Sequence, residues 1–292
     1  MAGSGSRRSL GRYAPSLSDD EINGHLRDKL RDYNSRDADA IRRHINTLRD
    51  ALQLSENDVI RTRFGGSTSR NTFVSGLSDS DVLAIVNDSS LSGRRPSEVI
   101  QYMAELIRQR LQRTRVVTGD LAVTVTFSNG NEIQFLPAIR TRYGVRIADA
   151  GQNRWSNVVH PERFARKLTQ VNQANEGRVV PTVKLAKGMV ARMIRSDKDR
   201  PSGYHIESLA IDAFRGYRGP RDLKSMLMHF TKYSSKAVLQ PMRDSTGQSR
   251  HVDGNLGRQG SAARRNAAAA FENMHAKLQN CRTERELDGL LD

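Results

Sequence analysis

Apolar side chains recur at helical spacing in the first part of the chain. They repeat every three or four positions over Ile22–Tyr33 and again over Ile41–Leu52. Ser18, a favourable N-cap residue, precedes the first run and is followed by three acids that suit the start of a helix. The pattern predicts two helices within residues 17–54.

Alternation of apolar and polar residues dominates the middle of the chain. Residues 121–127 and 132–136 alternate on either side of Asn129-Gly130, a dipeptide that favours a hairpin turn. The sequence therefore predicts a β-hairpin at this point. Further strands are expected to end at Phe64, to carry Asp79 and Asp81 and continue through residues 82–86, and to span residues 144–148.

The helical period returns near Pro96 and dominates from Pro161 onward. The order is helices, then a mixed segment of strands and helices, then helices again. It predicts an α+β protein with a boundary near residues 151–159. Helices are expected at residues 96–111, 161–176, 182–195, 204–214, 221–239 and 261–278.

The composition fits a globular protein that handles anions. Of 292 residues, 37% are apolar and 27% charged. No apolar run reaches the roughly 18–20 residues that span a bilayer, so a membrane partner is not expected. The net charge of +15 attracts polyanions such as nucleoside triphosphates or nucleic acid without choosing among them. Residues 1–16 read as a flexible tail, and the lone Cys281 fits a reducing cytoplasm.

Residues 64–81 predict a phosphate-binding turn next to a metal site. Gly66 and Ser67 follow a strand end and are expected to open a helix, whose first free N–H groups attract phosphate oxygens. The chain then returns into a strand on which Asp79 and Asp81 share one face. Two adjacent carboxylates repel each other unless a cation lies between them. Mg²⁺ accepts one or two such carboxylates together with substrate phosphates.

The string Gly66-Ser67-x-x-Arg70-x-Thr72, followed by Ser78-Asp79-x-Asp81, resembles a known signature. It is similar to that of the DNA polymerase beta-type nucleotidyltransferases, and more narrowly to their bacterial cGAS/DncV-like branch, which is also oligoadenylate synthetase-like. The resemblance implies a two-lobed nucleotidyltransferase fold, with a mixed β-sheet core, an N-terminal helical brace, a C-terminal helical lobe and nucleotides in the cleft between the lobes. The expected division is a flexible tail at 1–16, an α/β core with the N-terminal helices at 17–155, and a helical lobe at 156–292.

In that family a third acid completes the metal site, three positions before a proline on a neighbouring strand. Here the proline is Pro137, and the residue three positions earlier is the neutral Gln134. Glu132, two residues before Gln134 on the same face, is favoured as the third ligand beside Asp79 and Asp81, with Mg²⁺ or Mn²⁺ as the cofactor. Two alternatives stay open: Gln134 acts as a neutral ligand, or the site is weakened.

The resemblance also implies nucleotide contacts by Arg70 and by residues of the helical half. Lys187 matches a lysine that contacts the triphosphate, and Lys184 shares its helical face because it lies three residues earlier. Ser202 and Tyr204 match a segment whose tyrosine stacks on a base. The alternatives are two solvated lysines on an exposed face and an ordinary core tyrosine.

The implied activity joins nucleoside triphosphates, ATP or dATP-like ones first, into a cyclic or linear oligonucleotide messenger with release of pyrophosphate. By resemblance the context is antiphage defence, in which a separate effector protein reads the product. One alternative is template-independent synthesis of short linear DNA or RNA oligomers. Another is a catalytically weakened nucleotide-binding module. Activation of the protein by nucleic acid is not favoured.

Overall fold

The structure is a computed structural model. It describes residues 16–35, 38–52, 60–64, 66–74, 80–86, 91, 93–149, 152–244, 246 and 252–291, and for residues 38, 60–64, 80 and 81 it describes the backbone only. Residues 1–15 of the expected tail and Asp79 of the expected metal pair lie outside the described residues.

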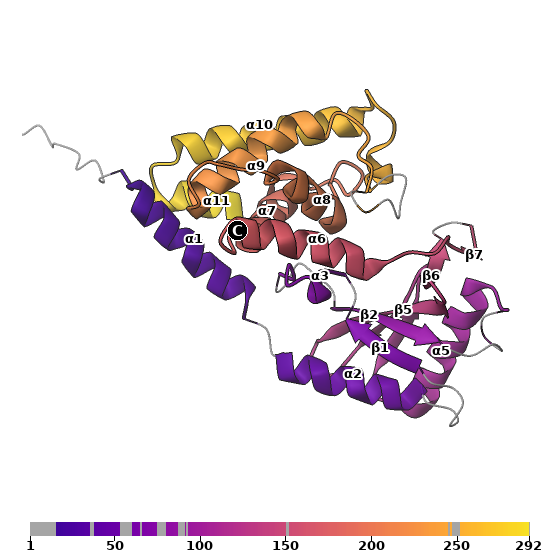
Figure 1. The fold of residues 1–292 in the computed structure, drawn as a ribbon. Helices are drawn as coiled ribbons and strands as arrows, with labels where there is room; N and C mark the ends of the chain where they lie inside the picture. Colours follow the sequence, from indigo (N-terminus) through magenta and orange to yellow (C-terminus); the bar gives the residue numbers. More distant parts are fainter. Residues whose placement is uncertain are drawn as a thin grey trace, which may run out of the picture.

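The chain folds into a sheet half and a helical half (Figure 1). In the sheet half, α2 (Ala38–Leu52) and α5 (Pro96–Arg110) cover one face of the sheet. Leu48 of α2 and Met103 of α5 are fully buried there against Phe135 of the sheet. The amphipathic pattern of both helices is explained by this single apolar contact face.

The helical half contains the N-terminal helix as well as the C-terminal ones. Its elements are α1 (Asp19–Tyr33), α6 (Pro161–Ala174), α7 (Val179–Met193), α8 (Gly203–Ala213), α9 (Leu223–Ala237), a 3₁₀ turn (Gly254–Leu256), α10 (Ala262–Asn280) and α11 (Glu284–Leu291). Ile22 and Leu26 of α1 are fully buried in one core with Met189 and Phe230. Helix α1 therefore packs with the helical half, whereas α2 packs with the sheet.

The sheet is mixed, and its strands are β1 (Ile60–Phe64), β2 (Ser80–Val86), β3 (Arg115–Thr118), β4 (Val123–Thr126), β5 (Glu132–Thr141), β6 (Gly144–Asp149) and β7 (Arg154–Trp155). The order is β1-β2-β5-β4-β3, and β2 runs parallel to β5. On its other edge, β5 pairs first with β4 and then, from Ala138, with β6. Pro137, which has no N–H to donate, lies where that edge changes partner.

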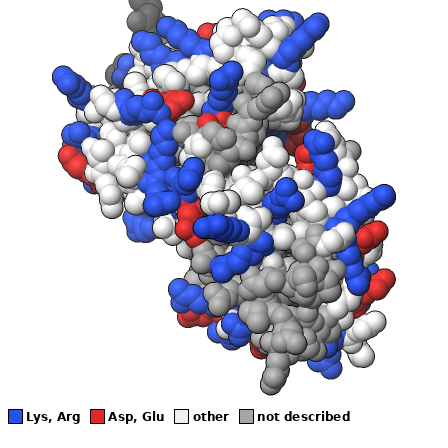
Figure 2. All heavy atoms as spheres, turned by 45° about the vertical axis from the view of Figure 1, so that its right-hand side comes forward, with Lys and Arg blue, Asp and Glu red and all other residues white. Residues whose placement is uncertain are grey.

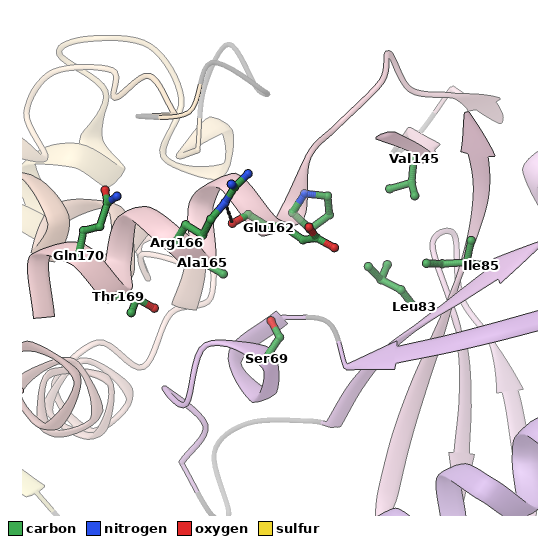
Figure 3. Close-up of a pocket in the computed structure, with 10 residues that line it drawn as sticks. Ser69, Leu83, Ile85, Val145, Glu162, Ala165, Arg166, Thr169 and Gln170 are labelled. Carbon is green, nitrogen blue, oxygen red and sulfur yellow. Dashed lines mark hydrogen bonds between the residues drawn. The ribbon is translucent and has the colours of Figure 1, made fainter. Parts of the chain in front are cut away.

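The two faces of the sheet have different neighbours. Val82 and Phe135 point into the core shared with α2 and α5. Leu83 and Ile85, which alternate with them along β2, lie on the opposite face near Ala138. This second face is the one that looks toward α6 and the helical half (Figures 1 and 3).

The structure confirms the α+β class and the two-lobed arrangement that the sequence predicted, with a mixed sheet in one half and helices in the other. It confirms the Ser18 cap, whose hydroxyl accepts from the Glu21 backbone N–H while the Glu21 carboxylate accepts from Ser18 N at 2.8 Å. It also confirms the hairpin across Asn129-Gly130. Strands β3 and β7 and helix α11 were not predicted. The division of the chain at residue 155 stays a prediction. Helix α1, which was assigned to the first part of that division, packs in the core of the helical half.

Candidate active site

A tight turn after β1 places the short helix α3 (Gly66–Ser69) between the two halves (Figure 1). Gly66 has a φ of +46°, a left-handed conformation that a residue with a Cβ adopts at a cost. The carbonyl of buried Ser67 accepts a hydrogen bond from the Thr72 backbone N–H at 3.0 Å. The helix predicted to open at Gly66-Ser67 is confirmed, and phosphate binding by this turn remains a prediction.

Strands β2 and β5 bring three of the predicted catalytic positions close together in register. Their parallel pairing places Asp81 opposite Gln134. Glu132 lies two residues before Gln134 on β5, is exposed, and accepts a hydrogen bond from Thr126 Oγ1 of β4 at 3.4 Å. Carboxylate and amide oxygens are ligands that Mg²⁺ accepts, so the donor set at these positions fits the ion.

Asp79 and the side chain of Asp81 fall outside the described part of the chain. Among the residues that are described, no three His, Cys, Asp or Glu side chains lie close enough together to hold a metal ion. The metal-ligand assignment therefore stays a prediction, and the register of Asp81 with Gln134 supports it.

A buried carboxylate, Glu207 of α8, joins two of the predicted nucleotide-binding residues. Its Oε1 lies 2.8 Å from Lys187 Nζ, and its Oε2 accepts from Arg70 Nε. Thr72 donates its hydroxyl to Glu207, and its backbone carbonyl accepts from Lys187 Nζ at 3.0 Å. Glu207 is fully buried and Lys187 is only 8% exposed. Lys187 is thus a buried, paired lysine, and the alternative of a solvated side chain is wrong for it.

The charge state of Glu207 follows from these neighbours. Burial by itself raises the pKa of a carboxyl group, because it penalises the charged form. Here Lys187, Arg70 and the hydrogen bond from Thr72 more than offset burial, so the pKa of Glu207 is lowered from its ordinary value. Glu207 is an anion at neutral pH. With two cations and one anion, the cluster keeps one formal positive charge.

Tyr204 stands at the first turn of α8, next to this cluster. Its ring contacts the Phe164 ring with centroids 4.4 Å apart, and the Arg70 guanidinium lies 5.7 Å from the Tyr204 centroid. Burial, and after it the carboxylate of Asp244, which accepts a hydrogen bond from the phenol, raise the pKa of Tyr204 above its ordinary value. The ring is partly buried and packs against the helical core. The structure therefore gives Tyr204 a packing role, and base stacking remains a prediction.

Two other candidates have different surroundings. Lys184 Nζ donates to Asn34 Oδ1 at the end of α1 at 2.5 Å, so this lysine contacts a different element from Lys187. Ser202 is the N-cap of α8, and its hydroxyl accepts from the His205 backbone N–H at 3.1 Å. The described contacts of both side chains are structural, and their nucleotide contacts stay predictions.

The structure thus joins Arg70 and Lys187 through Glu207 and places Tyr204 next to Arg70. Sequence reasoning missed Glu207. Its signal was an acid in an apolar stretch, because Glu207 lies among Ile206, Leu209 and their neighbours on α8. A charged residue on a buried helix face requires a partner of opposite sign.

A cavity of about 590 Å³ lies between α6 and the second face of the sheet (Figure 3). Thr169 and Gln170 line it from α6, and Leu83 and Ile85 line it from β2. Ser69 of α3 lies at its lower edge in Figure 3. The cavity therefore reaches the last residue of α3, the helix that opens at the predicted phosphate-binding residues Gly66 and Ser67. Its walls are apolar on the sheet side and polar on the helix side.

The excess of basic residues is visible on the surface. On the face drawn in Figure 2, lysine and arginine side chains project from both the upper and lower parts and outnumber the acidic ones. Within the described part of the chain, no helix combines the length and the apolar character needed to cross a membrane.

The model of the Second Messenger Oligonucleotide or Dinucleotide Synthetase (SMODS) domain matches residues 22–172, which is more than half of the 292-residue chain. No curated protein matches the sequence.

Similar solved structures cover nearly all of the chain. The Bradyrhizobium diazoefficiens CD-NTase CdnG in complex with GTP has a TM-score of 0.70 and 14% identity, over 93% of this chain and 96% of that one. The Escherichia coli MS115-1 CdnC with ATP has a TM-score of 0.67 and 14% identity, over 94% and 98%.

A third similar structure is the Vibrio cholerae DncV cyclic AMP-GMP synthase in complex with the linear intermediate pppA(3′,5′)pG. Its TM-score is 0.65 at 10% identity, over 95% of this chain and 91% of that one. Such low identities establish a shared fold, and the domain match establishes the family. This protein therefore belongs to the SMODS family of nucleotidyltransferases, in keeping with the cGAS/DncV-like motif in its sequence.

Proposed function

We propose that this protein joins nucleoside triphosphates into a cyclic or linear oligonucleotide second messenger. In each step a ribose or deoxyribose hydroxyl attacks the α-phosphorus of a triphosphate, a new phosphodiester bond forms, and pyrophosphate leaves. Such a reaction needs little covalent help from protein and depends on positioning and on stabilisation of phosphate charge. Membership of a synthetase family supports the proposal.

The observation that carries the proposal is the cluster around Glu207. It ties Arg70, next to the α3 turn, to Lys187 of the helical half, and it keeps one positive charge beside the turn. A triphosphate whose oxygens lie at Gly66 and Ser67 would lie next to the positive charge of this cluster. Charge-assisted contacts of lysine and arginine with phosphate are stronger than neutral hydrogen bonds. Tyr204, which adjoins Arg70, would hold the base.

The positions of Asp79, Asp81 and Glu132, with Gln134 as the alternative to Glu132, would hold Mg²⁺ or Mn²⁺. A bound divalent ion stabilises negative charge on the attacking and leaving oxygens. The parallel register of Asp81 with Gln134 supports this assignment, since it puts the two strands that carry these residues side by side.

The identity of the product and its cellular use belong to the same proposal. The relatives in complex with GTP, with ATP and with the linear intermediate pppA(3′,5′)pG support ATP or a similar triphosphate as the substrate. We infer a cytoplasmic protein of antiphage defence, whose product is read by a separate effector.

The test is to incubate the protein with labelled ribo- and deoxynucleoside triphosphates and Mg²⁺ or Mn²⁺, and to identify products by mass spectrometry. Product must disappear in the Asp79→Ala/Asp81→Ala double variant. It must persist in Glu105→Ala/Glu272→Ala, which removes the same charge from two exposed helix positions. Synthesis that survives the first double variant would refute the assignment of the site.

One observation favours a second candidate function. The neutral Gln134 lies beside Asp81, where the family pattern has an acid. A site with fewer carboxylates would bind nucleotides with weakened turnover. Nucleotide binding without any product, under both metals, would support this module over the enzyme.

A further inference from the structure

A second cavity, of about 430 Å³, lies at the outer end of the site, where the β5–β6 turn approaches the start of α6. Four arginines line it: Arg140 from the end of β5, Arg142 from the β5–β6 turn, and Arg163 and Arg166 from α6. Glu162 is the only carboxylate among the lining residues. The formal charge of the lining is thus three positive at neutral pH, apart from His160.

The four arginines of this cavity form no ion pair with an acid in the described part of the chain. All four side chains are exposed. Arg166 Nε donates only to its own helix, to the Glu162 carbonyl at 3.4 Å (Figure 3). Four guanidinium groups held around one cavity repel one another, and an anion between them relieves that repulsion. Guanidinium groups also match phosphate geometry closely.

An exposed aromatic ring accompanies the arginines. Tyr143, at the tip of the β5–β6 turn, is 68% exposed. The Arg142 guanidinium lies over this ring, 5.5 Å from its centroid. An exposed ring beside a basic groove is the combination that binds single-stranded nucleic acid, because the ring stacks on a base while the cations hold phosphates.

The arginine-lined cavity adjoins the cavity of Figure 3. The two share Ile85, Val145, Pro161, Glu162 and Arg166 as lining residues. The larger cavity in turn reaches Ser69 of α3. A path therefore runs from the end of α3, along α6, to the four arginines.

We propose that the arginine-lined cavity binds the phosphates of a short single-stranded oligonucleotide, with Tyr143 stacking on one of its bases. The bound oligonucleotide would lie along the path from α3. The arginine-lined cavity would therefore hold a linear oligonucleotide as it leaves or re-enters the active site. The identification of this strand with the protein's own linear product rests on the proposed function. A short strand of cellular RNA or DNA offers the same chemistry.

The test measures binding by fluorescence anisotropy, without added metal or triphosphate. The probes are labelled single-stranded DNA and RNA octamers, the octamer duplex, and any linear product purified from the synthesis assay. The variant is Arg140→Ala/Arg142→Ala. Its matched control, Arg113→Ala/Arg115→Ala, removes two exposed arginines near β3, at the other edge of the sheet.

We expect Arg140→Ala/Arg142→Ala to weaken single-strand binding by roughly tenfold or more. The slope of log binding constant against log salt concentration should become shallower by about 1.4, which is about 0.7 for each lost phosphate contact. Tyr143→Ala should weaken binding while Tyr143→Phe keeps it. Equal effects of the two double variants, or binding of duplex alone, would overturn the proposal. If the purified linear product displaces the octamers, the natural ligand is the protein's own product. If the octamers bind more tightly than the product, the natural ligand is a cellular oligonucleotide. Arginine-dependent octamer binding by a protein that makes no product would sink the proposed function and leave this site standing.

Discussion

Lys187 Nζ and Glu207 Oε1 lie 2.8 Å apart in the interior of the helical half. The pair joins α7 to α8, and Arg70 extends it to the segment that follows α3. A buried ion pair of this kind adds little net stability over an apolar pair, although it is costly to break. Its consequence is positional: one carboxylate fixes where both cations stand before any substrate arrives.

Glu207→Gln should destabilise the protein strongly. The amide keeps the volume of the carboxylate but leaves the two cations without an anion in a buried site. Removing one partner of a buried pair costs about 3–5 kcal/mol, so the free energy of unfolding at pH 7, measured with urea, should fall by about that amount. Glu105→Gln, on the exposed face of α5, is the control.

The pH dependence separates charge from shape at Glu207. Because the pKa of Glu207 is lowered in the folded protein, its contribution to stability is present above the ordinary value of 4.5 and is lost as the pH falls through the folded pKa. The stability difference between wild type and Glu207→Gln should therefore shrink below pH 4.5. A difference that is constant with pH would show that the charge is not involved.

Wild-type protein should lose stability in weak acid because of His205, and His205→Leu should abolish this part of the pH dependence. Burial, with Arg264 acting in the same sense and Asp253 opposing, lowers the pKa of His205 to about 4. The unfolded chain therefore takes up this proton first, and wild-type stability should fall as the pH drops from 6.5 toward 4. Neither ring nitrogen has a hydrogen-bond partner among the described residues, so leucine loses no bond there. Urea unfolding at pH 7 and 5 measures the effect, and equal pH slopes for both proteins would contradict it.

Lys187→Ala should raise the Michaelis constant for triphosphate. A charge-assisted phosphate contact is worth about 1.5–3 kcal/mol, or roughly tenfold or more in the apparent constant. Lys236→Ala, at an exposed position near the end of α9, is the matched control. Steady-state kinetics must be compared with unfolding curves. A lower folded fraction with an unchanged Michaelis constant would leave Lys187 a structural residue.

Tyr204→Ala should weaken nucleotide binding by about 1–3 kcal/mol if the ring stacks on a base. Its ring also packs on Phe164, so some loss of stability is expected with it. Tyr204→Phe should keep the binding and lose about 1 kcal/mol of stability, because the hydrogen bonds of the hydroxyl with Asp244 and Thr246 disappear while the ring stays. Melting temperature and Michaelis constant should be measured on the same samples. Unchanged binding by the alanine variant would retire Tyr204 as a substrate contact.

Glu132→Ala should lower synthesis by orders of magnitude if Glu132 is the third metal ligand, whereas Gln134→Ala should do much less. The reason is that a carboxylate offsets the charge of a divalent ion and an amide does not. Initial rates across a Mg²⁺ titration measure the difference. The reverse ranking would assign the role to Gln134, and two small effects would place the third ligand elsewhere.

Local signals in the sequence predicted local structure well. The Ser18–Glu21 cap, the Asn129-Gly130 hairpin and the start of α6 at Pro161 depend on residues a few positions apart, and the structure confirms them. Strand β3 was missed because four residues are too few for a clear alternation. The α3 helix was predicted from the Gly66-Ser67 motif after a strand end, and the structure adds that Gly66 has a positive φ there.

Long-range pairing was beyond those signals. The pattern of α1 showed an apolar face without showing which half would cover it. Lys187 was recognisable from its motif. Its partner Glu207 lies twenty residues further along the chain, and only the fold shows that it is buried against Lys187. The arginines at 140 and 166 are scattered in sequence, and only the fold places them around one cavity.

The packing of α1 has a consequence for how the protein can be dissected. Leu17 N donates to the carbonyl of Arg282 at 2.8 Å, and the Tyr33 hydroxyl donates to that of Leu291 at 3.1 Å. The helical half is therefore encoded by two separate stretches of the gene, with the sheet half inserted between them. A fragment of residues 156–292 would lack α1, the helix that covers Met189 and its neighbours. A self-sufficient helical fragment would need α1 fused back through a linker, as in a protein from which an inserted domain has been excised.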